Sequence, residues 1–313
     1  MTVRTPLVQS HIHELEGTHD VRRLYLKTEN LQPIGAFKLR GAYNKIVSLS
    51  DGEGQRGVIT YSSGNHAQGV AYAARALGVK AVVVMPRNAP ENKRQATASM
   101  GAEIVLVGPG SDERKAKAEE LAAQHGYVIV PPYNDEQIIA GQGTIGLEIL
   151  EDLPDVETVI VPVGGGGMIS GVATAIKLSK PSVQVIGAEP ELAADAQASL
   201  RSGKIVQFPA EQVSRTAADG LRTQSIGEIN FGHIRRYVDD IVTVSEDEIC
   251  DAMRRLAADP KTTAEPSGAV SVAAFLFRRE QLPRTKVNVV IISGGNIAPE
   301  TLDELKAGAH QNT

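Results

Sequence analysis

The sequence of 313 residues contains no tryptophan, only five phenylalanines and a single cysteine, Cys250. Because platforms that stack single-stranded nucleic acid are built from aromatic side chains, this shortage argues against such a ligand. The formal net charge is −5, so no excess of basic residues favours nucleic acid or anionic membrane as a partner. One cysteine cannot form an internal disulfide, which favours a reducing compartment. In its amphipathic run, Cys250 is interpreted as a small buried side chain and not as a nucleophile.

Long apolar runs are also missing. No stretch approaches the ~18 apolar residues of a membrane span, and the first ten residues have no apolar core of signal-peptide length. We therefore expect a cytoplasmic protein without a membrane partner. What the chain does contain is many small residues, including 30 glycines. Its length suffices for one large or two ordinary domains.

Short, nearly all-apolar runs alternate with longer segments of helical periodicity. This alternation predicts an α/β protein, because parallel strands that are buried on both faces read as continuous apolar runs. The predicted strands are residues 57–61, 80–85, 103–107, 127–130, 158–163, 183–188, 241–244 and 287–292. The predicted helices are residues 64–77, 92–100, 112–124, 135–151, 168–180, 193–202, 246–257 and 267–280.

The order of these elements predicts two domains. Four of the predicted strands lie between residues 57 and 134, so we interpret 57–134 as a small domain. It is inserted into a large domain formed by residues 1–56 and 135–313. Open α/β sheets bind ligands beyond the carboxyl ends of their strands. The active site is therefore expected in the cleft between the domains, with its motifs directly after strands.

Four consecutive glycines, Gly164, Gly165, Gly166 and Gly167, separate the predicted strand 158–163 from a helix. Without Cβ atoms, backbone N–H groups can converge on an anion, and the helix N-terminus adds a favourable dipole. The run lacks the Lys-Ser/Thr ending of a nucleoside-triphosphate loop and the spaced glycines of a dinucleotide fingerprint. A flexible turn is the alternative, but its chain entropy would be costly without a ligand. The run predicts a phosphate site.

A second polar turn, formed by Ser62, Ser63, Gly64, Asn65 and His66, follows the predicted strand at 57–61. Its hydroxyl, amide and backbone N–H groups could bind a carboxylate. A helix N-cap needs only one such side chain, so the density of polar groups favours a binding site. His66 alone is a weak signal, because a packed structural imidazole is at least as common.

Two further segments are weak signals when each is considered alone. Ser293 begins a Ser-Gly-Gly-Asn turn after the predicted strand 287–292, and many turns have such a composition. Lys38 lies among apolar and small residues at positions 35–42. Burial there would lower the pKa of the lysine and provide a free amine for Schiff-base chemistry. A surface lysine with its stem along a short helix is the alternative.

Together these segments resemble the serine/threonine dehydratase and serine racemase family of fold-type II pyridoxal 5′-phosphate (PLP) enzymes. The resemblance extends over almost the whole chain. It includes, in order, GAFKLRGA (35–42), SSGNHAQG (62–69), AGQGTIGLE (140–148), VPVGGGGM (161–168), GAEPELAAD (187–195), ADGLR (218–222), EPSGA (265–269) and SGGN (293–296). The family implies a tryptophan synthase β-like fold with two open, twisted, mostly parallel sheets flanked by helices. Its active site lies in the interdomain cleft.

The resemblance also implies roles for individual residues. Lys38 would bind PLP as a Schiff base, Phe37 would flank one face of the ring, Asn65 would hydrogen-bond the ring 3′-oxygen and Ser293 would meet the pyridine nitrogen. The phosphate would be held by Gly164, Gly165, Gly166, Gly167 and the backbone of Met168. The substrate carboxylate would be bound by Ser62, Ser63, Gly64, Asn65 and His66, with Asn134 lining the cleft.

The activity implied by this family is elimination of water from a small L-β-hydroxy-amino acid, giving a 2-oxo acid and ammonia. Lys38 would remove the α-proton while PLP accepts the electrons. Ser63 matches the position of a second base on the opposite face of the substrate, so a racemase is the alternative. Ala36 stands where many members have serine, which keeps substituted substrates such as 3-hydroxyaspartate open beside threonine and serine. A binding protein without catalysis is disfavoured, because Lys38, Asn65 and the glycines are all present.

A divalent-cation site is a further expectation. Glu189, Ala193 and Asp195 are spaced like the metal site of this family. Two carboxylates and a carbonyl offer hard oxygen ligands suited to Mg²⁺, Mn²⁺ or Ca²⁺. A solvated acidic helix start is the alternative. The family also implies that the protein assembles as a homodimer or homotetramer. It further implies that the protein binds a small amino-acid substrate.

Overall fold

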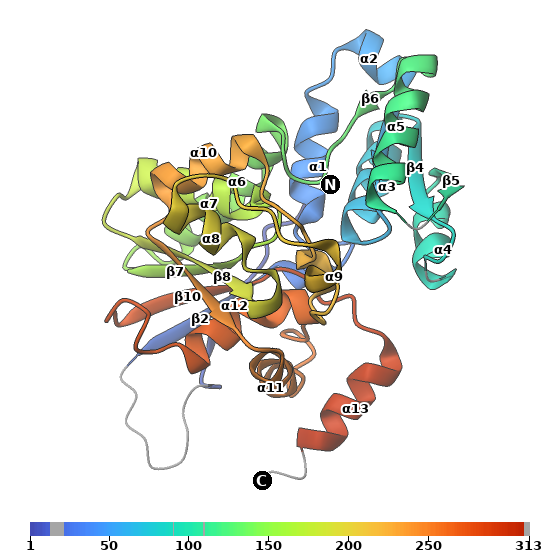
Figure 1. Cartoon of the computed structure of the whole chain (residues 1–313). Helices are drawn as coiled ribbons and strands as arrows, with labels where there is room; N and C mark the ends of the chain where they lie inside the picture. The colour runs from blue at the N-terminus through green and yellow to red at the C-terminus, as the bar shows by residue number, and fades with distance from the viewer. Residues whose placement is uncertain (13–21, 90, 109, 310–313) are drawn as a thin grey trace.

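The computed structural model describes residues 1–12, 22–89, 91–108 and 110–309, which form two sheets flanked by helices (Figure 1). The larger sheet has the strand order β1-β2-β10-β7-β8-β9, and the smaller has the order β5-β4-β3-β6. Strand β1 is antiparallel to β2, and the other pairings among the described strands are parallel. The predicted fold class is confirmed.

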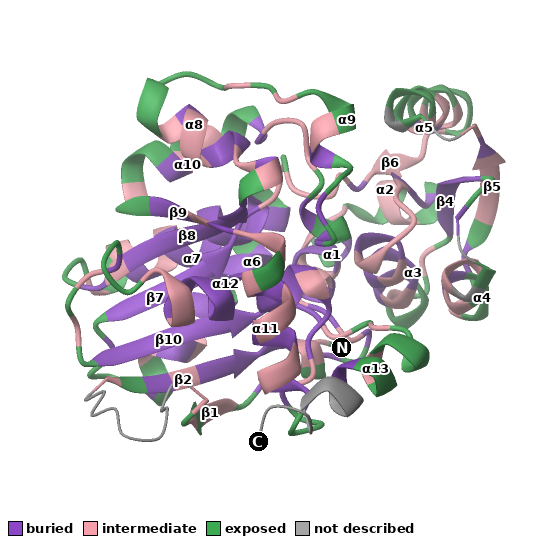
Figure 2. Ribbon diagram, turned by 60° about the horizontal axis from the view of Figure 1, so that its bottom comes forward, coloured by how far each residue is buried: buried purple, intermediate pink, exposed green. Residues whose placement is uncertain are grey.

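The central strands β7, β8 and β10 of the larger sheet are almost entirely buried, in agreement with their apolar sequences (Figure 2). In β7, Ile160 packs toward one side with α11 and α12, whereas Val159 and Val161 pack toward the other side with α6 and α7. Its strands are β1 (Leu7–Ser10), β2 (Arg23–Thr28), β7 (Thr158–Pro162), β8 (Gln184–Pro190), β9 (Asp240–Val244) and β10 (Val287–Ile292). Its helices are α6 (Glu136–Asp152), α7 (Gly167–Ser179), α8 (Asp195–Ser202), α10 (Glu228–Tyr237), α11 (Glu246–Leu256) and α12 (Pro266–Phe277).

The smaller sheet is also covered on both faces. Val83 and Met85 of β4 pack in a core with α1 and α3, whereas Val82 and Val84 pack in a core that includes Ala118 of α5. This unit contains β3 (Val58–Tyr61), β4 (Ala81–Pro86), β5 (Glu103–Val107), β6 (Val128–Ile129), α3 (Asn65–Leu77), α4 (Glu91–Ser99) and α5 (Ser111–His125).

Helix α1 (Lys38–Val47) lies between the two sheets and packs against both α3 and α6 (Figure 1). The remaining helical segments are short or peripheral. They are η1 (Glu29–Leu31), α2 (Asp51–Arg56), η2 (Glu191–Ala193), α9 (Ala210–Val213), η3 (Asp219–Leu221) and α13 (Pro299–Ala309). In the part of the chain that the structure describes, no helix is long and apolar enough to cross a membrane.

All eight predicted strands and all eight predicted helices are present, with ends shifted by a few residues. The prediction omitted β1, β2, α1, α2, α9, α10 and α13. Strand β2 was missed because Lys27 interrupts its apolar run, yet this side chain is fully buried beside Glu148. Cys250 is partly buried and packs against the core under α11, as expected.

Candidate active site

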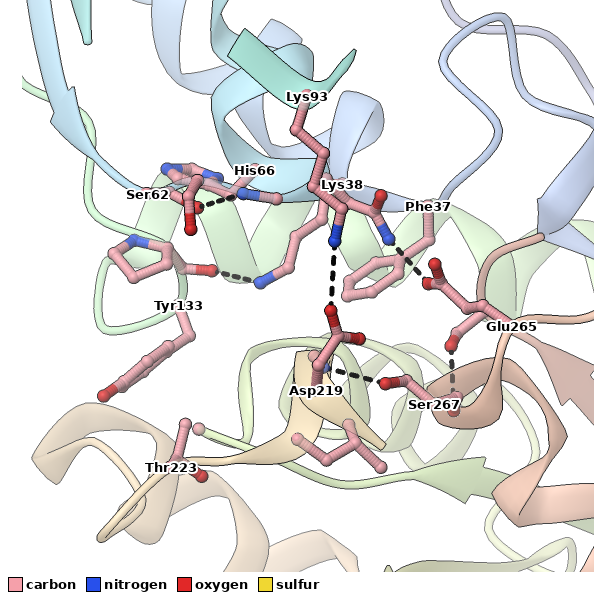
Figure 3. A pocket seen from close by; sticks show the side chains of 18 of the residues that line it. Phe37, Lys38, Ser62, His66, Lys93, Tyr133, Asp219, Thr223, Glu265 and Ser267 are labelled. Carbon is pink, nitrogen blue, oxygen red and sulfur yellow. Dashed lines mark hydrogen bonds and ion pairs between the residues drawn. The ribbon is translucent and has the colours of Figure 1, made fainter. Parts of the chain in front are cut away.

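The carboxyl ends of β3, β7 and β10 meet at a cavity of about 280 Å³ between the two sheets (Figure 3). Residues from both sheets line this cavity, which we call the central cavity. Among them are Phe37, Lys38, Ser62, Ser63, Gly64, Asn65, His66, Gly165 and Ser293. A small adjoining cavity is lined by Gly164, Gly165, Gly166, Gly167 and Met168. Apart from Asn134, the residues expected to bind cofactor or substrate are therefore together.

Lys38 is the first residue of α1, and its amine points into the central cavity (Figure 3). Its Nζ atom donates a hydrogen bond of 2.7 Å to the carbonyl oxygen of Pro132 and lies 5.1 Å from the centre of the Phe37 ring. Burial lowers the pKa of this amine from 10.5 to about 8. This raises the fraction of free amine at neutral pH by roughly two orders of magnitude. Lys38 is thus prepared for nucleophilic and base chemistry.

The four-glycine run connects β7 to α7 and has no space for side chains. Gly166 has a φ of +90° at the N-terminus of α7, in the left-handed region that favours glycine. A Cβ atom on Gly165 would collide with the ring of Tyr133, and one on Gly167 would lie 2.9 Å from the Tyr133 Cβ atom. The N-terminus of α7 and the bare backbone before it suit a phosphate group.

Asn65 begins α3, and side chains from the larger sheet hold both ends of its amide. Its Nδ2 atom donates to Glu265 Oε1 at 2.6 Å, and its Oδ1 atom accepts from Asn296 Nδ2 at 2.7 Å. Burial, followed by the negative charge of Asp219, raises the pKa of Glu265 to about 7, although the hydrogen bond from Asn65 opposes this. Glu265 begins the EPSGA segment, but its sequence neighbours do not indicate a role for it. Its position becomes informative only beside Asn65.

His66 is a structural side chain in this arrangement. It is buried, and its Nε2 atom lies 2.9 Å from the carbonyl oxygen of Val130. Burial and the nearby charge of Lys38 lower the pKa of His66 to about 3, against the effect of the Val130 hydrogen bond. The imidazole is therefore neutral at physiological pH and cannot supply a positive charge for a carboxylate.

Ser293 lies directly after β10, at the end of the central cavity near α12. Its hydroxyl donates to the carbonyl oxygen of Ser267 at 3.3 Å. The Ser267 hydroxyl in turn accepts from the backbone N–H of Gly220 at 2.8 Å. Ser293, the predicted partner of a ring nitrogen, is thus a neutral hydroxyl that lines the same cavity as the Ser62–Ser63 turn.

A second cavity of about 530 Å³, which we call the outer cavity, shares five lining residues with the central one. These are Tyr61, Arg114, Pro132, Tyr133 and Thr223. The hydroxyl of Thr223 is buried and has no hydrogen-bond partner. Burial raises the pKa of the Tyr133 hydroxyl to about 12 and lowers the pKa of the half-buried Arg114. These side chains come from four separate segments of the chain, so the sequence alone does not group them into one site.

Across the mouth of the central cavity, Lys93 of α4 faces Asp219 of η3 (Figure 3). The Lys93 Nζ atom lies 3.1 Å from Asp219 Oδ2. This ion pair joins the unit of the smaller sheet to that of the larger sheet, and both side chains are partly exposed. Exposed pairs of this kind contribute little to stability.

Asn134 does not reach the central cavity. It lines the outer cavity, and its Oδ1 atom accepts a hydrogen bond of 3.0 Å from the backbone N–H of Ile229 in the first turn of α10. The side chain therefore satisfies an unpaired N–H at the start of that helix. The family resemblance implied that Asn134 lines the cleft; the structure places it on the wall of the outer cavity, where the unpredicted helix α10 engages its carbonyl oxygen.

Glu189 and Asp195 are both fully buried at the end of β8 and the start of α8. The Glu189 carboxylate accepts from the backbone N–H groups of Ala196 at 3.0 Å and Gln197 at 2.8 Å, whereas neither Asp195 oxygen has a hydrogen-bond partner. Burial raises the pKa of Asp195 to about 7, although the nearby backbone N–H groups of Asp195 and Ile226 favour its charged form. Burial and the charge of Asp195 also raise the pKa of Glu189. Among the described residues, no cluster of three or more His, Cys, Asp or Glu side chains could hold a metal ion.

Comparison with known proteins identifies relatives along most of the chain. The family model for pyridoxal-phosphate dependent enzymes matches residues 2–294. The L-threonine ammonia-lyase of Thermotoga maritima is 49% identical over 282 residues, which cover 90% of this chain and 69% of that protein. The L-threo-3-hydroxyaspartate ammonia-lyase of Saccharomyces cerevisiae is 44% identical over 275 residues, covering 88% and 83%. The structure of maize serine racemase superimposes with a TM-score of 0.90 at 37% identity, covering 100% of this chain and 94% of that one.

Proposed function

The chain belongs to the family of pyridoxal-phosphate dependent enzymes, and on that premise we propose that it is an ammonia-lyase. It eliminates water from a small L-β-hydroxy-amino acid of the threonine or serine type, and a water molecule then hydrolyses the resulting enamine to a 2-oxo acid and ammonia. The observation that carries this proposal is the buried Lys38 amine, whose pKa is about 8. It lies where the glycine run, the Ser62–Ser63 turn and Ser293 converge.

The residues of the site fit PLP. The backbone of Gly164 to Gly167 at the start of α7 would hold its phosphate, Ser293 would face its ring nitrogen and Lys38 would carry it. When bound, PLP supplies an electron sink for the negative charge that develops at the substrate α-carbon. Ser62, Ser63 and the N-terminus of α3 bind the substrate carboxylate. The Lys38 amine then takes the α-proton.

The experiment that tests this function measures 2-oxo acid release by the PLP-loaded protein. The substrates are L-serine, D-serine, L-threonine, the 3-hydroxyaspartate isomers and phenylserine, and Lys38→Ala is the control. Oxo-acid release from L-threonine or L-serine that disappears in Lys38→Ala supports the proposal. Absence of oxo acid from every substrate, in a protein that retains PLP, overturns it.

L-threo-3-hydroxyaspartate is a second candidate substrate. The outer cavity continues beyond the Lys38 amine, so a β-substituent larger than the methyl group of threonine has space there. Its shared wall carries the guanidinium of Arg114 and the unpartnered hydroxyl of Thr223. Arg114 and Thr223 are suitable partners for a second carboxylate, because guanidinium groups bind carboxylates in a bidentate manner.

Racemisation is the alternative reaction, and Ser63 is its candidate second base. Ser63 and Lys38 come from the two units and line the same cavity. If one residue removes the α-proton and the other donates a proton to the opposite face, the configuration of the α-carbon is inverted. Chiral analysis of the assay mixtures distinguishes this reaction, because the L-amino acid is converted to its D-enantiomer while no oxo acid forms.

We propose that Glu189, the carbonyl oxygen of Ala193 and Asp195 bind a divalent cation such as Mg²⁺, Mn²⁺ or Ca²⁺. The two unpartnered oxygens of the buried Asp195 carboxylate support this site, since a buried charge without partners is costly. Hard oxygen ligands suit these ions. None of these three residues lines the cavities proposed to hold PLP, so we assign the cation a structural role.

Three further proposals concern organisation. Residues 57–134 form a small domain inserted in a large domain of residues 1–56 and 135–313, in agreement with the separate strand orders of the two sheets.

The protein assembles as a homodimer or homotetramer, which light scattering of the purified chain tests directly. It acts in the cytoplasm, which fractionation of the producing cells tests.

A further inference from the structure

Two of the recognised sequence segments, GAFKLRGA and AGQGTIGLE, each contain a charged residue that the proposed reaction does not use. Arg40 follows Lys38 by two residues on α1, and Glu148 lies on α6. The structure brings them together: Arg40 Nη1 donates to Glu148 Oε1 at 2.7 Å, and Arg40 Nη2 donates to Glu148 Oε2 at 2.8 Å. Such paired hydrogen bonds are geometrically specific.

Glu29 and Lys27 complete a buried ionic cluster with Arg40 and Glu148. Arg40 Nε donates to Glu29 Oε2 and Arg40 Nη2 to Glu29 Oε1, both at 2.8 Å, while Lys27 Nζ donates to Glu148 Oε2 at 2.6 Å. Lys27 and Glu29 are fully buried and Arg40 is 4% exposed. The cluster has two positive and two negative groups. Burial opposes charge on Glu148, but Arg40 and Lys27 outweigh it and lower the pKa of this carboxyl.

Glu29 binds both ends of the segment that carries Lys38. Gln32, six residues before the lysine, donates from Nε2 to Glu29 Oε2 at 3.2 Å. Arg40, two residues after it, donates to both Glu29 oxygens. One carboxylate thus closes the chain from residue 32 to residue 40 into a loop. Because this carboxylate lies on η1, directly after β2, the loop is fixed to the larger sheet.

The middle of the same loop is attached to the strand end that carries Ser293. The backbone N–H of Phe37 donates to the carbonyl oxygen of Ser293 at 3.0 Å, and Ala36 forms an isolated bridge with Gly294. Lys38 and Ser293 are the two residues proposed to hold PLP at its aldehyde and at its ring nitrogen. The distance between them therefore depends on how the loop is held.

We propose that Glu29 and Arg40 are positioning residues that hold the Lys38 backbone at a set distance and angle from Ser293. Helix α1 also packs against α3 of the other unit, where Gly69 approaches the backbone of Lys38. Any movement of α3 would be transmitted to the lysine unless its first turn were anchored. The Glu29–Arg40–Glu148 contacts provide that anchor on the side of the larger sheet. This inference rests on the proposed function, because it assigns Lys38 to the cofactor.

The test compares Arg40→Met with Lys27→Met in the PLP-loaded protein. Each variant removes one buried cation from the cluster, but Lys27 lies on β2 and has no hydrogen bond to the segment 32–40. Arg40→Lys is the milder variant, because it keeps the positive charge but loses the planar guanidinium group that forms paired hydrogen bonds with carboxylates. The readouts are the pH midpoint of the visible absorption band of the bound cofactor, kcat and KM, and the unfolding temperature.

We expect Arg40→Lys and Arg40→Met to shift the midpoint of the absorption band and to lower kcat by about 10- to 100-fold, since small displacements of a reacting group have effects of this size. KM should change by less than about threefold, because the carboxylate-binding turn is intact. Lys27→Met should lower the unfolding temperature as much as Arg40→Met does while leaving the band midpoint unchanged.

Equal band midpoints in Arg40→Lys, Lys27→Met and the unaltered protein would overturn the inference, whatever happens to stability. The inference would also be overturned if Lys27→Met lost as much kcat as an Arg40 variant with the same decrease in unfolding temperature. If the unaltered protein shows no visible band with PLP, the proposed function itself fails. The two failures are therefore distinguishable.

Discussion

The Lys38 amine lies 2.7 Å from the carbonyl oxygen of Pro132, which belongs to the segment joining the two sheets. Tyr133, the next residue, packs its ring on Gly165 of the glycine run. One short segment therefore contacts both the amine and the loop that would hold the phosphate. The Pro132 carbonyl oxygen accepts a hydrogen bond from the amine but provides no negative charge, so burial dominates the pKa of Lys38.

Replacement of this amine should change how stability depends on pH. The unfolded chain binds more protons than the folded chain between pH 8 and 10.5, because the folded pKa is about 8. The free energy of unfolding of the PLP-free protein therefore rises with pH across this window. Below pH 8, Lys38→Met should be more stable by up to about 3 kcal/mol, and the difference should vanish near pH 10.5. Urea unfolding of both proteins at pH 7 and 10.5 checks this, and a pH-independent difference would contradict it.

Gly166→Ala should weaken PLP binding by about tenfold or more, because it strains the left-handed turn that begins α7 and moves its N–H groups. Gly203→Ala is the matched control, since Gly203 has a φ of +73° and open space around it. Both substitutions should cost about 1 kcal/mol in backbone strain. Equilibrium titration with PLP should separate them, and equal affinities in the two variants would count against a phosphate site at α7.

Arg114→Met should lower kcat/KM for L-threo-3-hydroxyaspartate by at least about tenfold and affect L-threonine much less, because only the former carries a second carboxylate. Lys115→Met is the control, since Lys115 lines the outer cavity but not the central cavity. Steady-state assays of both substrates measure the ratio. An equal loss for both substrates would indicate that Arg114 has a general role in the site.

Asp195→Asn should change stability in opposite directions with and without a divalent cation. In the presence of a chelator, the variant should be more stable than the unaltered protein by about 1 kcal/mol or more, because it removes a buried carboxylate without hydrogen-bond partners. Added Mg²⁺, Mn²⁺ or Ca²⁺ should raise the unfolding temperature of the unaltered protein only. Thermal unfolding with each ion checks this, and identical responses of the two proteins would exclude the site.

Local sequence patterns determined much of this protein. Apart from β1 and β2, the strands of both sheets could be predicted because parallel strands buried on both faces are apolar throughout. The glycine run could be placed because its conformation needs glycine. The polar turn beginning at Ser62 followed a predicted strand, which placed it at the edge of a sheet where ligands bind. Each of these inferences depends on neighbours within about ten residues.

Only the tertiary structure decided which polar groups are buried and with what partners. Lys27 and Glu29 look like surface residues in the sequence, yet they are fully buried with Arg40 and with Glu148, which is more than a hundred residues away. Asn134 lines the outer cavity, and only the structure shows that its carbonyl oxygen accepts a hydrogen bond from Ile229 of α10. Burial and long-range pairing set the energy of a charge, and a linear pattern contains neither of them.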